Sequence, residues 1–219
     1  MPPDDPRAVH SRHDLRRLNR IMGHSSVLAA ALTNHLRTPP RRLADIGAGD
    51  GTLMLQLAAQ THQCWPYVHV TLVDQQTTAS AETKAQFAQY GWEAEIICAD
   101  IFDWLNQIEQ PLDAIIANLF LHHFGSRQLA VLMHKASEHS HCFVACEPSR
   151  DWFALAASSC VGVIGCNAVT RHDARLSVKS GFAGNELSDL WLRNGWKLQE
   201  QRAGLFTHLF AAHRNGATT

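Results

Sequence analysis

The chain has 219 residues, of which 46% are hydrophobic and 18% are charged, so it is long enough to bury one ordinary core and short for two. The net charge of −1 lacks the basic excess of proteins that bind a phosphate backbone, so we expect no nucleic-acid partner. The six cysteines show no C-x-x-C spacing, which favours free structural thiols and predicts no metal site.

No apolar run approaches the roughly 20 residues that are needed to span a bilayer. The first residues, M-P-P-D-D-P, lack the apolar core of a signal peptide, so we expect a cytoplasmic protein with no membrane span. Residues 1–10 are rich in proline and aspartate and are predicted to form a disordered tail, because they bury too little apolar surface. Residues 11–219 are predicted to form a single domain.

Two helices are predicted within residues 11–40. The first begins near Ser11 and ends at Gly23, and the second covers residues 27–37 and stops at the prolines that follow. Packing of these helices against a sheet explains most of their apolar residues. The residues at the break between the two helices are candidates for contact with a ligand: Met22, Gly23 and His24.

The chain then passes from a short apolar run, residues 43–46, through a G-x-G-x-G turn into a helical pattern that begins at Leu53. The turn glycines are Gly47, Gly49 and Gly51. Glycine allows backbone dihedrals that a Cβ forbids, and it lets a ligand lie directly on the backbone at the start of a helix. The dinucleotide pattern G-x-G-x-x-G would need a glycine at Thr52, so the spacing argues against a nicotinamide-dependent oxidoreductase.

Asp45 lies two residues before the first glycine, and with it the segment closely resembles motif I of the class I S-adenosylmethionine-dependent methyltransferases. The rest of the chain is most similar to the small-molecule branch of that family. The resemblance implies that S-adenosylmethionine is the cofactor. It also implies that Asp45 and the amides of the glycine turn hold the methionine end of the cofactor.

A second strand is predicted at residues 69–74, and a helix whose packing face is made of alanines follows at residues 78–90. Asp74 ends the strand about 25 residues after the turn, where nucleotide-binding βαβ units place an acid on the ribose hydroxyls. The alternative is an acid that caps the next helix. Gln75 is then expected to border the adenine.

A third strand is predicted at residues 94–100, and it ends at Asp100. The family resemblance implies that Asp100 accepts a hydrogen bond from the adenine 6-amino group and that Ile101 offers its backbone N–H. The alternative is that Asp100 caps a short helix over residues 103–107.

The fourth strand, residues 112–118, is a near-continuous apolar run that ends at Asn118, a further cofactor candidate. The turn after it contains His122 and His123. A Leu-His-His turn resembles the small-molecule branch and departs from the Asn-Pro-Pro-Tyr motif of enzymes that methylate adenine. Histidine titrates near neutral pH, so we predict His123, or else His122, as the general base, with structural roles as the alternative.

The fifth strand, residues 141–147, ends in Glu147-Pro148, and a helical cap insertion is predicted at residues 149–184. The cap is interpreted as a lid over the substrate or as a homodimer contact. Its candidate residues are Arg150 and Arg171 for a substrate carboxylate and His172 as a weaker rival base. A last helix, residues 186–194, precedes two strands, residues 196–202 and 206–213, that alternate like an antiparallel pair.

The predicted fold class is α/β: a Rossmann-like, doubly wound, mostly parallel seven-stranded sheet with an antiparallel last strand. Polar residues end successive parallel strands, and ligands bind at that edge of such sheets. The sequence therefore predicts methyl transfer from S-adenosylmethionine to a small molecule, specifically to oxygen of a phenolic or polyketide-like metabolite. The alternatives are a protein methyltransferase and a methyltransferase-like binding partner without turnover.

Overall fold

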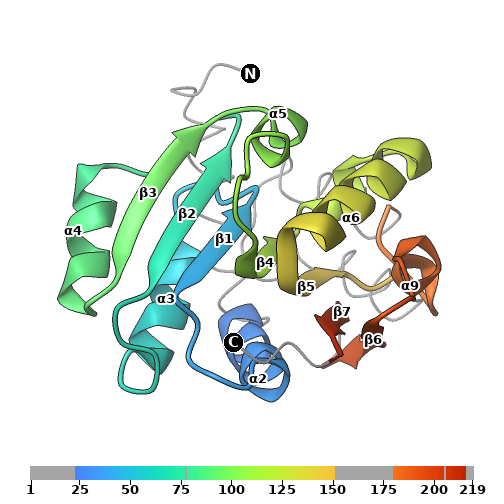
Figure 1. Cartoon of the computed structure of the whole chain (residues 1–219), viewed down its shortest axis with the longest axis horizontal. Helices are drawn as coiled ribbons and strands as arrows, with labels where there is room; N and C mark the ends of the chain where they lie inside the picture. The colour runs from blue at the N-terminus through green and yellow to red at the C-terminus, as the bar shows by residue number, and fades with distance from the viewer. Residues whose placement is uncertain (1–22, 77, 151–179, 205, 216–219) are drawn as a thin grey trace, which may run out of the picture.

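A single seven-stranded sheet organises the part of the chain that the computed structural model describes, namely residues 23–76, 78–150, 180–204 and 206–215. The strand order is β3-β2-β1-β4-β5-β7-β6 (Figure 1). Strands β1 to β5 are parallel, and β7 lies between β5 and β6, antiparallel to both. The strands are β1 (Arg42–Ile46), β2 (His69–Asp74), β3 (Glu93–Cys98), β4 (Leu112–Asn118), β5 (Ser140–Pro148), β6 (Trp196–Ala203) and β7 (Thr207–Arg214).

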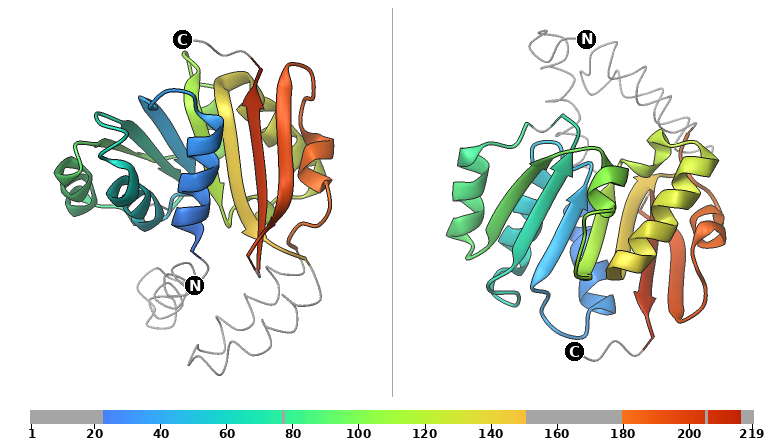
Figure 2. Two further views of the ribbon diagram at one scale, coloured as in Figure 1. Left: turned by 90° about the horizontal axis from the view of Figure 1, so that it is seen from below. Right: turned by 45° about the horizontal axis from the view of Figure 1, so that its top comes forward.

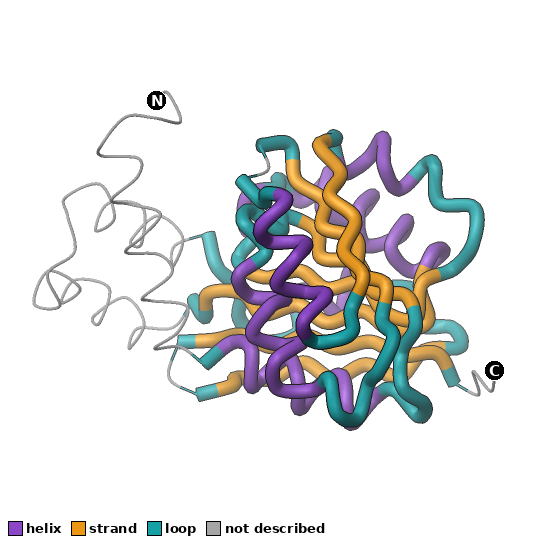
Figure 3. Tube along the Cα trace, turned by 90° about the vertical axis from the view of Figure 1, so that its left-hand side faces the viewer, coloured by secondary structure: helices purple, strands orange, loops and turns teal. Residues whose placement is uncertain are grey.

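Helices cover both faces of the sheet and enclose two apolar cores (Figures 2 and 3). One face carries α2 (His24–His35), α3 (Thr52–Thr61) and α4 (Ala81–Gln89). The other face carries α5 (Ile101–Leu105), α6 (Ser126–His139) and α9 (Glu186–Leu190). The Rossmann-like, doubly wound sheet with an antiparallel last strand is therefore confirmed.

The central position of β4, which is covered on both faces, explains why its sequence is almost continuously apolar. Ala114 and Ile116 belong to the core under α2 and α3, whereas Ile115 and Ala117 belong to the core under α6. Successive side chains of a strand point to opposite faces, so a strand that is covered on both faces needs apolar residues at every position. The predicted bounds of β2 and β4 agree with the structure.

Two helices differ from their predicted form. The predicted alanine face of α4 is wrong, because Phe87 is the buried residue of this helix and its alanines are exposed. A single large ring fills the space against the sheet that three methyl groups would leave open. Helix α5 begins at Ile101 and not at residue 103, because the Asp100 side chain accepts a hydrogen bond from Phe102 N–H (2.8 Å) and caps the helix.

Three of the remaining predictions also need adjustment. Strand β3 ends at Cys98, two residues before Asp100, and α9 ends at Leu190, four residues earlier than predicted. Helix α2 begins at His24, because Gly23 adopts a left-handed conformation (φ 64°) as its N-cap. The predicted tail, the predicted first helix up to Met22, and Arg171 and His172 of the predicted cap lie outside the described residues.

Within the described ranges, no helix is long and apolar enough to cross a membrane. Of the four cysteines there, Cys142 and Cys146 are buried in strand β5, as expected of core thiols, whereas Cys64 and Cys98 are exposed.

Helix α2 packs against strands β5 and β7, and this contact brings two histidines together. The His35 and His213 rings stack with their centroids 4.6 Å apart. Partial burial lowers the pKa of both rings below the ordinary value of 6.5, and the positive potential of Lys197 and Arg37 lowers the pKa of His213 further. Protonation of this pair is therefore unfavourable in the folded state.

We expect the free energy of unfolding to decrease as the pH falls below about 6.5, because the unfolded chain then binds protons that the folded pair resists. The variant His213→Gln should lose less stability than the wild type between pH 7 and pH 5, and urea denaturation at both pH values measures this. His134→Gln, on the exposed face of α6, is the control. An unchanged pH dependence in His213→Gln would contradict the assignment.

Candidate active site at the carboxyl edge of the sheet

The glycine turn connects β1 to α3 and is fastened to the end of β2. Gly47 and Ala48 donate their N–H groups to the Val73 carbonyl (2.8 and 3.1 Å). Gly49 donates its N–H to Asp74 Oδ2 (2.9 Å). The turn is therefore preorganised by the neighbouring strand before any ligand binds.

A cavity of about 280 Å³ opens beside this turn at the carboxyl edge of the sheet. Its lining residues are Gly47, Val73, Asp74, Gln75, Ala99, Ile101, Phe120, His123 and Phe124. Gly47 has a positive φ of 75°, and a Cβ there would lie only 2.3 Å from Cδ2 of the Phe120 ring. The first glycine of the turn is thus required both by its backbone conformation and by the close approach of an aromatic ring.

Three of the predicted cofactor residues meet at one end of this cavity. The carboxylate of Asp74 accepts hydrogen bonds from Gly49 N–H and, through Oδ1, from Gln76 N–H (2.8 Å). The Gln75 amide donates to Asp100 Oδ2 (2.6 Å), which joins the ends of β2 and β3. Asp100 also caps α5, so the predicted alternative of a capping role is present alongside its position in the site.

Asp45 lies in β1, two residues before Gly47, and is almost completely buried (2% exposed). Its Oδ1 has no hydrogen-bond partner among the described residues. Burial raises the pKa of Asp45 to about 8, and the negative charges of Asp74 and Asp50 contribute to the shift. A buried carboxyl group without a partner is costly, and a bound cation would compensate for it.

The turn after β4 is held by one buried carboxylate. Glu147, at the end of β5, is fully buried, and its Oε1 accepts hydrogen bonds from Phe120 N–H (2.9 Å) and Leu121 N–H (2.8 Å). Leu119 has a positive φ of 52°, which is uncommon for a residue with a branched side chain. Such strain persists where surrounding contacts fix it, and it gathers at functional sites.

The two histidines of this turn have different surroundings. The His122 ring is buried, and its Nδ1 donates to Glu147 Oε2 (2.7 Å), so a carboxylate fixes its orientation. His123 is exposed at the edge of the cavity. Loss of hydration lowers the pKa of His123, the neighbouring His122 lowers it further, and the charge of Glu147 opposes both effects. His123 is therefore largely neutral at pH 7.

Asn118 and His24 meet on the other face of the sheet. His24 is completely buried, and its Nε2 lies 2.9 Å from Thr207 Oγ1 at the start of β7. Burial lowers the pKa of His24, and the nearby Asn118 side chain and the Glu147 charge oppose this shift. Of the residues predicted at the break between the first helices, the structure describes Gly23 and His24 and places His24 beside the end of β4.

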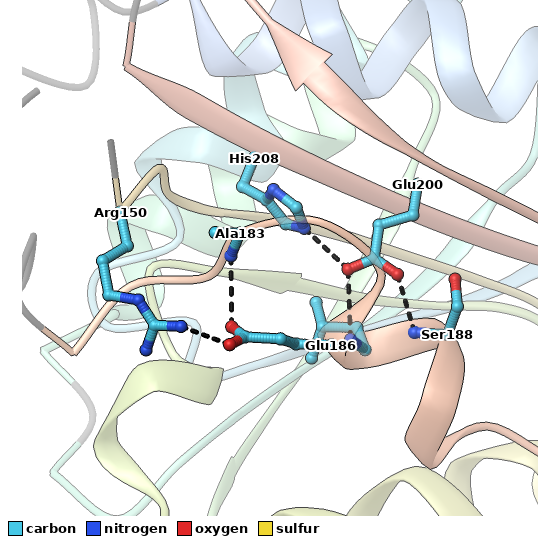
Figure 4. Close-up of polar contacts among 7 residues, drawn as sticks. Arg150, Ala183, Glu186, Ser188, Glu200 and His208 are labelled. Carbon is cyan, nitrogen blue, oxygen red and sulfur yellow. Dashed lines mark hydrogen bonds and ion pairs between the residues drawn. The ribbon is translucent and has the colours of Figure 1, made fainter. Parts of the chain in front are cut away.

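A second group of polar residues lies where α9 packs on β6 and β7 (Figure 4). Glu200 accepts hydrogen bonds from Leu187 N–H (3.1 Å) and Ser188 N–H (2.7 Å) at the start of α9 and pairs with His208 Nε2 (2.7 Å). These contacts lower the pKa of Glu200 against the opposing effect of its burial. Arg150, a predicted ligand for a substrate carboxylate, forms an ion pair with Glu186.

The structure brings most of the predicted site residues to one edge. Of the predicted residues, those that line the cavity are Gly47, Asp74, Gln75, Ile101 and His123. Gly49 and Gly51 complete the turn, Asp45 precedes it in β1, and Asp100 is hydrogen-bonded to Gln75. Asn118 contacts His24 on the other face of the sheet, and His122 is held by Glu147. The sequence noted the Glu-Pro end of β5 but missed that Glu147 organises the turn after β4. It also missed the Glu200–His208 pair. The signal for Glu147 was an acid ending an otherwise apolar strand.

A parallel sheet in this strand order, with an antiparallel β7 inserted beside β5 and a glycine turn after β1, is the fold of the class I methyltransferases. Residues 43–142 match the family model described as a methyltransferase domain. The matched stretch covers less than half of the chain, and within it the chain is similar to methyltransferase domains.

Solved structures with the same fold include two that cover most of this chain. An O-methyltransferase family protein from Burkholderia thailandensis has a TM-score of 0.65 and 18% sequence identity, covering 92% of this chain and 57% of that one. The plantazolicin methyltransferase BpumL, in complex with a triazolic desmethylPZN analog and SAH, has a TM-score of 0.67 and 13% identity, covering 96% and 92%.

A similarity in sequence is confined to a shorter stretch. Over 82 residues the chain is 33% identical to a tRNA1(Val) (adenine(37)-N6)-methyltransferase from Enterobacter sp. strain 638. The match covers 36% of this chain and only 31% of that protein.

A matched set of variants tests the close approach of Gly47 to Phe120. Gly47→Ala and Gly49→Ala both place a Cβ at positive φ, but only the Cβ of residue 47 meets a neighbour. We expect Gly47→Ala to destabilise the fold by about 1–3 kcal/mol more than Gly49→Ala, in urea denaturation. Adding Phe120→Ala should remove most of this difference, and an undiminished difference would contradict the contact.

The burial of Asp45 predicts that this residue lowers the stability of the ligand-free protein at high pH. With its pKa raised to about 8, native Asp45 holds a proton at pH 7 that the unfolded chain releases, so its contribution to stability decreases as the pH rises from about 4 to 8. Asp45→Asn should remove this dependence and stabilise the ligand-free protein by about 1–3 kcal/mol at pH 8. Urea denaturation at pH 5 and pH 8 measures both effects. A less stable variant at pH 8 would contradict the argument.

Proposed function

We propose that this chain transfers the methyl group of S-adenosylmethionine to an oxygen nucleophile of a small phenolic or polyketide-like metabolite. The observation that carries the proposal is the arrangement of polar residues around a single cavity at the carboxyl edge of the sheet. S-adenosylmethionine would supply a methyl group that is activated by its attachment to a sulfonium. The task of the protein is then to orient this group toward the acceptor, which contributes roughly 7–11 kcal/mol in well-oriented reactions.

The residues present fit this cofactor. The unpaired Oδ1 of Asp45 offers an acceptor for the ammonium group of its methionine end, and Asp45 would release its proton when this cation binds. Asp74 uses two of its lone-pair positions for Gly49 and Gln76, and a carboxylate has about four, so two remain for the ribose hydroxyls. Asp100 and Ile101 lie one strand further along, where they suit the adenine, with Gln75 at its border.

Proton removal is the second requirement, because a phenol with a pKa of about 10 is mostly neutral at pH 7. We propose His123 as the base, since its ring lines the cavity and is largely neutral at that pH. His122 is the alternative, because Glu147 orients its imidazole as a carboxylate orients the base in other catalytic pairs. Asn118, at the end of β4, would lie next to the methyl group.

A structured RNA is the second candidate acceptor, favoured by the local similarity to a tRNA methyltransferase. The turn Asn118-Leu119-Phe120-Leu121 lacks the Asn-Pro-Pro-Tyr motif of enzymes that methylate adenine, which supports the small-molecule proposal. Radiolabelled S-adenosylmethionine, incubated with the chain and either a panel of phenols and carboxylic acids or total tRNA, distinguishes the two. Label in the RNA alone would overturn the small-molecule proposal.

With an acceptor from that panel, replacing the histidine that acts as the base by alanine should lower kcat at pH 7 by about 10²–10⁴-fold. The loss of kcat should become smaller as the pH approaches the pKa of the acceptor. His123→Ala and His122→Ala are compared with His134→Ala, which is exposed on α6. If both variants of the turn keep full turnover at neutral pH, neither histidine is the base.

A further inference from the structure

The ring of Phe120 lies directly on the backbone of the first glycine of the turn. A Cβ on Gly47 would lie 2.3 Å from Phe120 Cδ2 and 2.6 Å from Phe120 Cγ, so the ring covers the Cα of this glycine. Both residues line the cavity, which therefore ends where they meet. Glycine allows a ligand to approach the backbone closely, and here an aromatic ring uses that same bare surface.

The size and the lining of the cavity agree with such a partial closure. Its volume of about 280 Å³ lies slightly below the range of about 300–1,000 Å³ that is usual for small-molecule sites. Asp74, Gln75 and Ile101, the residues proposed to hold the nucleoside, all line it. A ligand that extends from these residues onto the glycine turn has to pass through the place of the Phe120 ring.

The backbone of Phe120 is fixed, whereas its side chain is free to rotate. Glu147 Oε1 accepts hydrogen bonds from the N–H groups of Phe120 (2.9 Å) and Leu121 (2.8 Å). The Phe120 ring is only partly buried, and its edge-to-face contact with Phe124 has the ring centroids 5.0 Å apart. One aromatic contact of this kind is weak enough to be exchanged for contact with a ligand.

We propose that Phe120 is a gate of the cofactor site, and that its ring rotates away from Gly47 before the amino-acid half of the cofactor can lie on the turn. The inference rests on the proposed function and adds a closing device to that site. The ring and the ligand compete for one surface. The observed dissociation constant is therefore the intrinsic constant divided by the fraction of chains in which the gate is open.

Two ligands and two substitutions test the gate. S-adenosylhomocysteine carries the amino-acid half, whereas 5′-methylthioadenosine has the same nucleoside and thioether without it. Phe120→Leu removes the ring and keeps an apolar side chain. Phe102→Leu is the matched control, because the Phe102 ring contacts Phe124 (centroids 5.8 Å apart) from outside the lining of the cavity. Calorimetry on the full chain gives the dissociation constants, and surface plasmon resonance gives the rates.

We expect Phe120→Leu to bind S-adenosylhomocysteine about 2- to 10-fold more tightly than the wild type, which corresponds to the loss of one aromatic contact. The gain should appear in the association rate, because the substitution raises the fraction of chains that are open. Binding of 5′-methylthioadenosine should be unchanged in Phe120→Leu. Phe102→Leu should bind both ligands as the wild type does.

The other outcomes contradict the gate in different ways. Weaker binding of both ligands to Phe120→Leu would show that the ring is a wall in contact with the ligand, and would overturn the inference. Equal affinities in this variant and the wild type, or an equal gain in Phe102→Leu, would also overturn it. If Phe120→Leu does not fold, Phe120→Met takes its place. If the wild type and the Phe120 variant both bind neither ligand, the proposed cofactor site is wrong, and the gate with it.

Discussion

The parallel register of strands β1 to β5 is the constraint on which the site depends. Because these strands run in one direction, the residue that ends each strand arrives at the same edge of the sheet. The hydrogen bond from Gly49 N–H to Asp74 then ties the end of β2 to the turn after β1. A similar link joins Gln75 to Asp100. The glycine turn and its acidic neighbours are therefore held in place by the architecture of the sheet.

Glu147 supplies the same kind of support on the other side of β1. It holds the backbone after β4 in a conformation that includes a positive φ at Leu119. This side of the site contains polar atoms that the fold leaves unpaired, and Asp45 Oδ1 is the clearest of them. Unpaired buried groups lower stability, and natural proteins retain them where function requires them. The ammonium group of the proposed cofactor would account for the retention of Asp45 Oδ1.

The sequence predicted those parts of the structure that depend on local pattern. Strands β2 and β4 are short apolar runs bounded by polar residues, and the turn glycines have a fixed spacing, so their positions agree with the structure. The alanine face of α4 was wrong because helical spacing alone does not show which side meets the sheet. The role of Glu147 could not be predicted, since it depends on residues 25 or more positions away.

The central claim is that the cavity beside Gly47 binds S-adenosylmethionine, and calorimetric titration with its product S-adenosylhomocysteine tests it most directly. The account predicts a dissociation constant in the micromolar range for the wild type, with no binding of NADH. The variant Asp74→Ala should lose most of this affinity, because it removes the acceptors for the ribose hydroxyls and releases the glycine turn. No binding to the wild type, or binding that is indifferent to Asp74, would contradict the account.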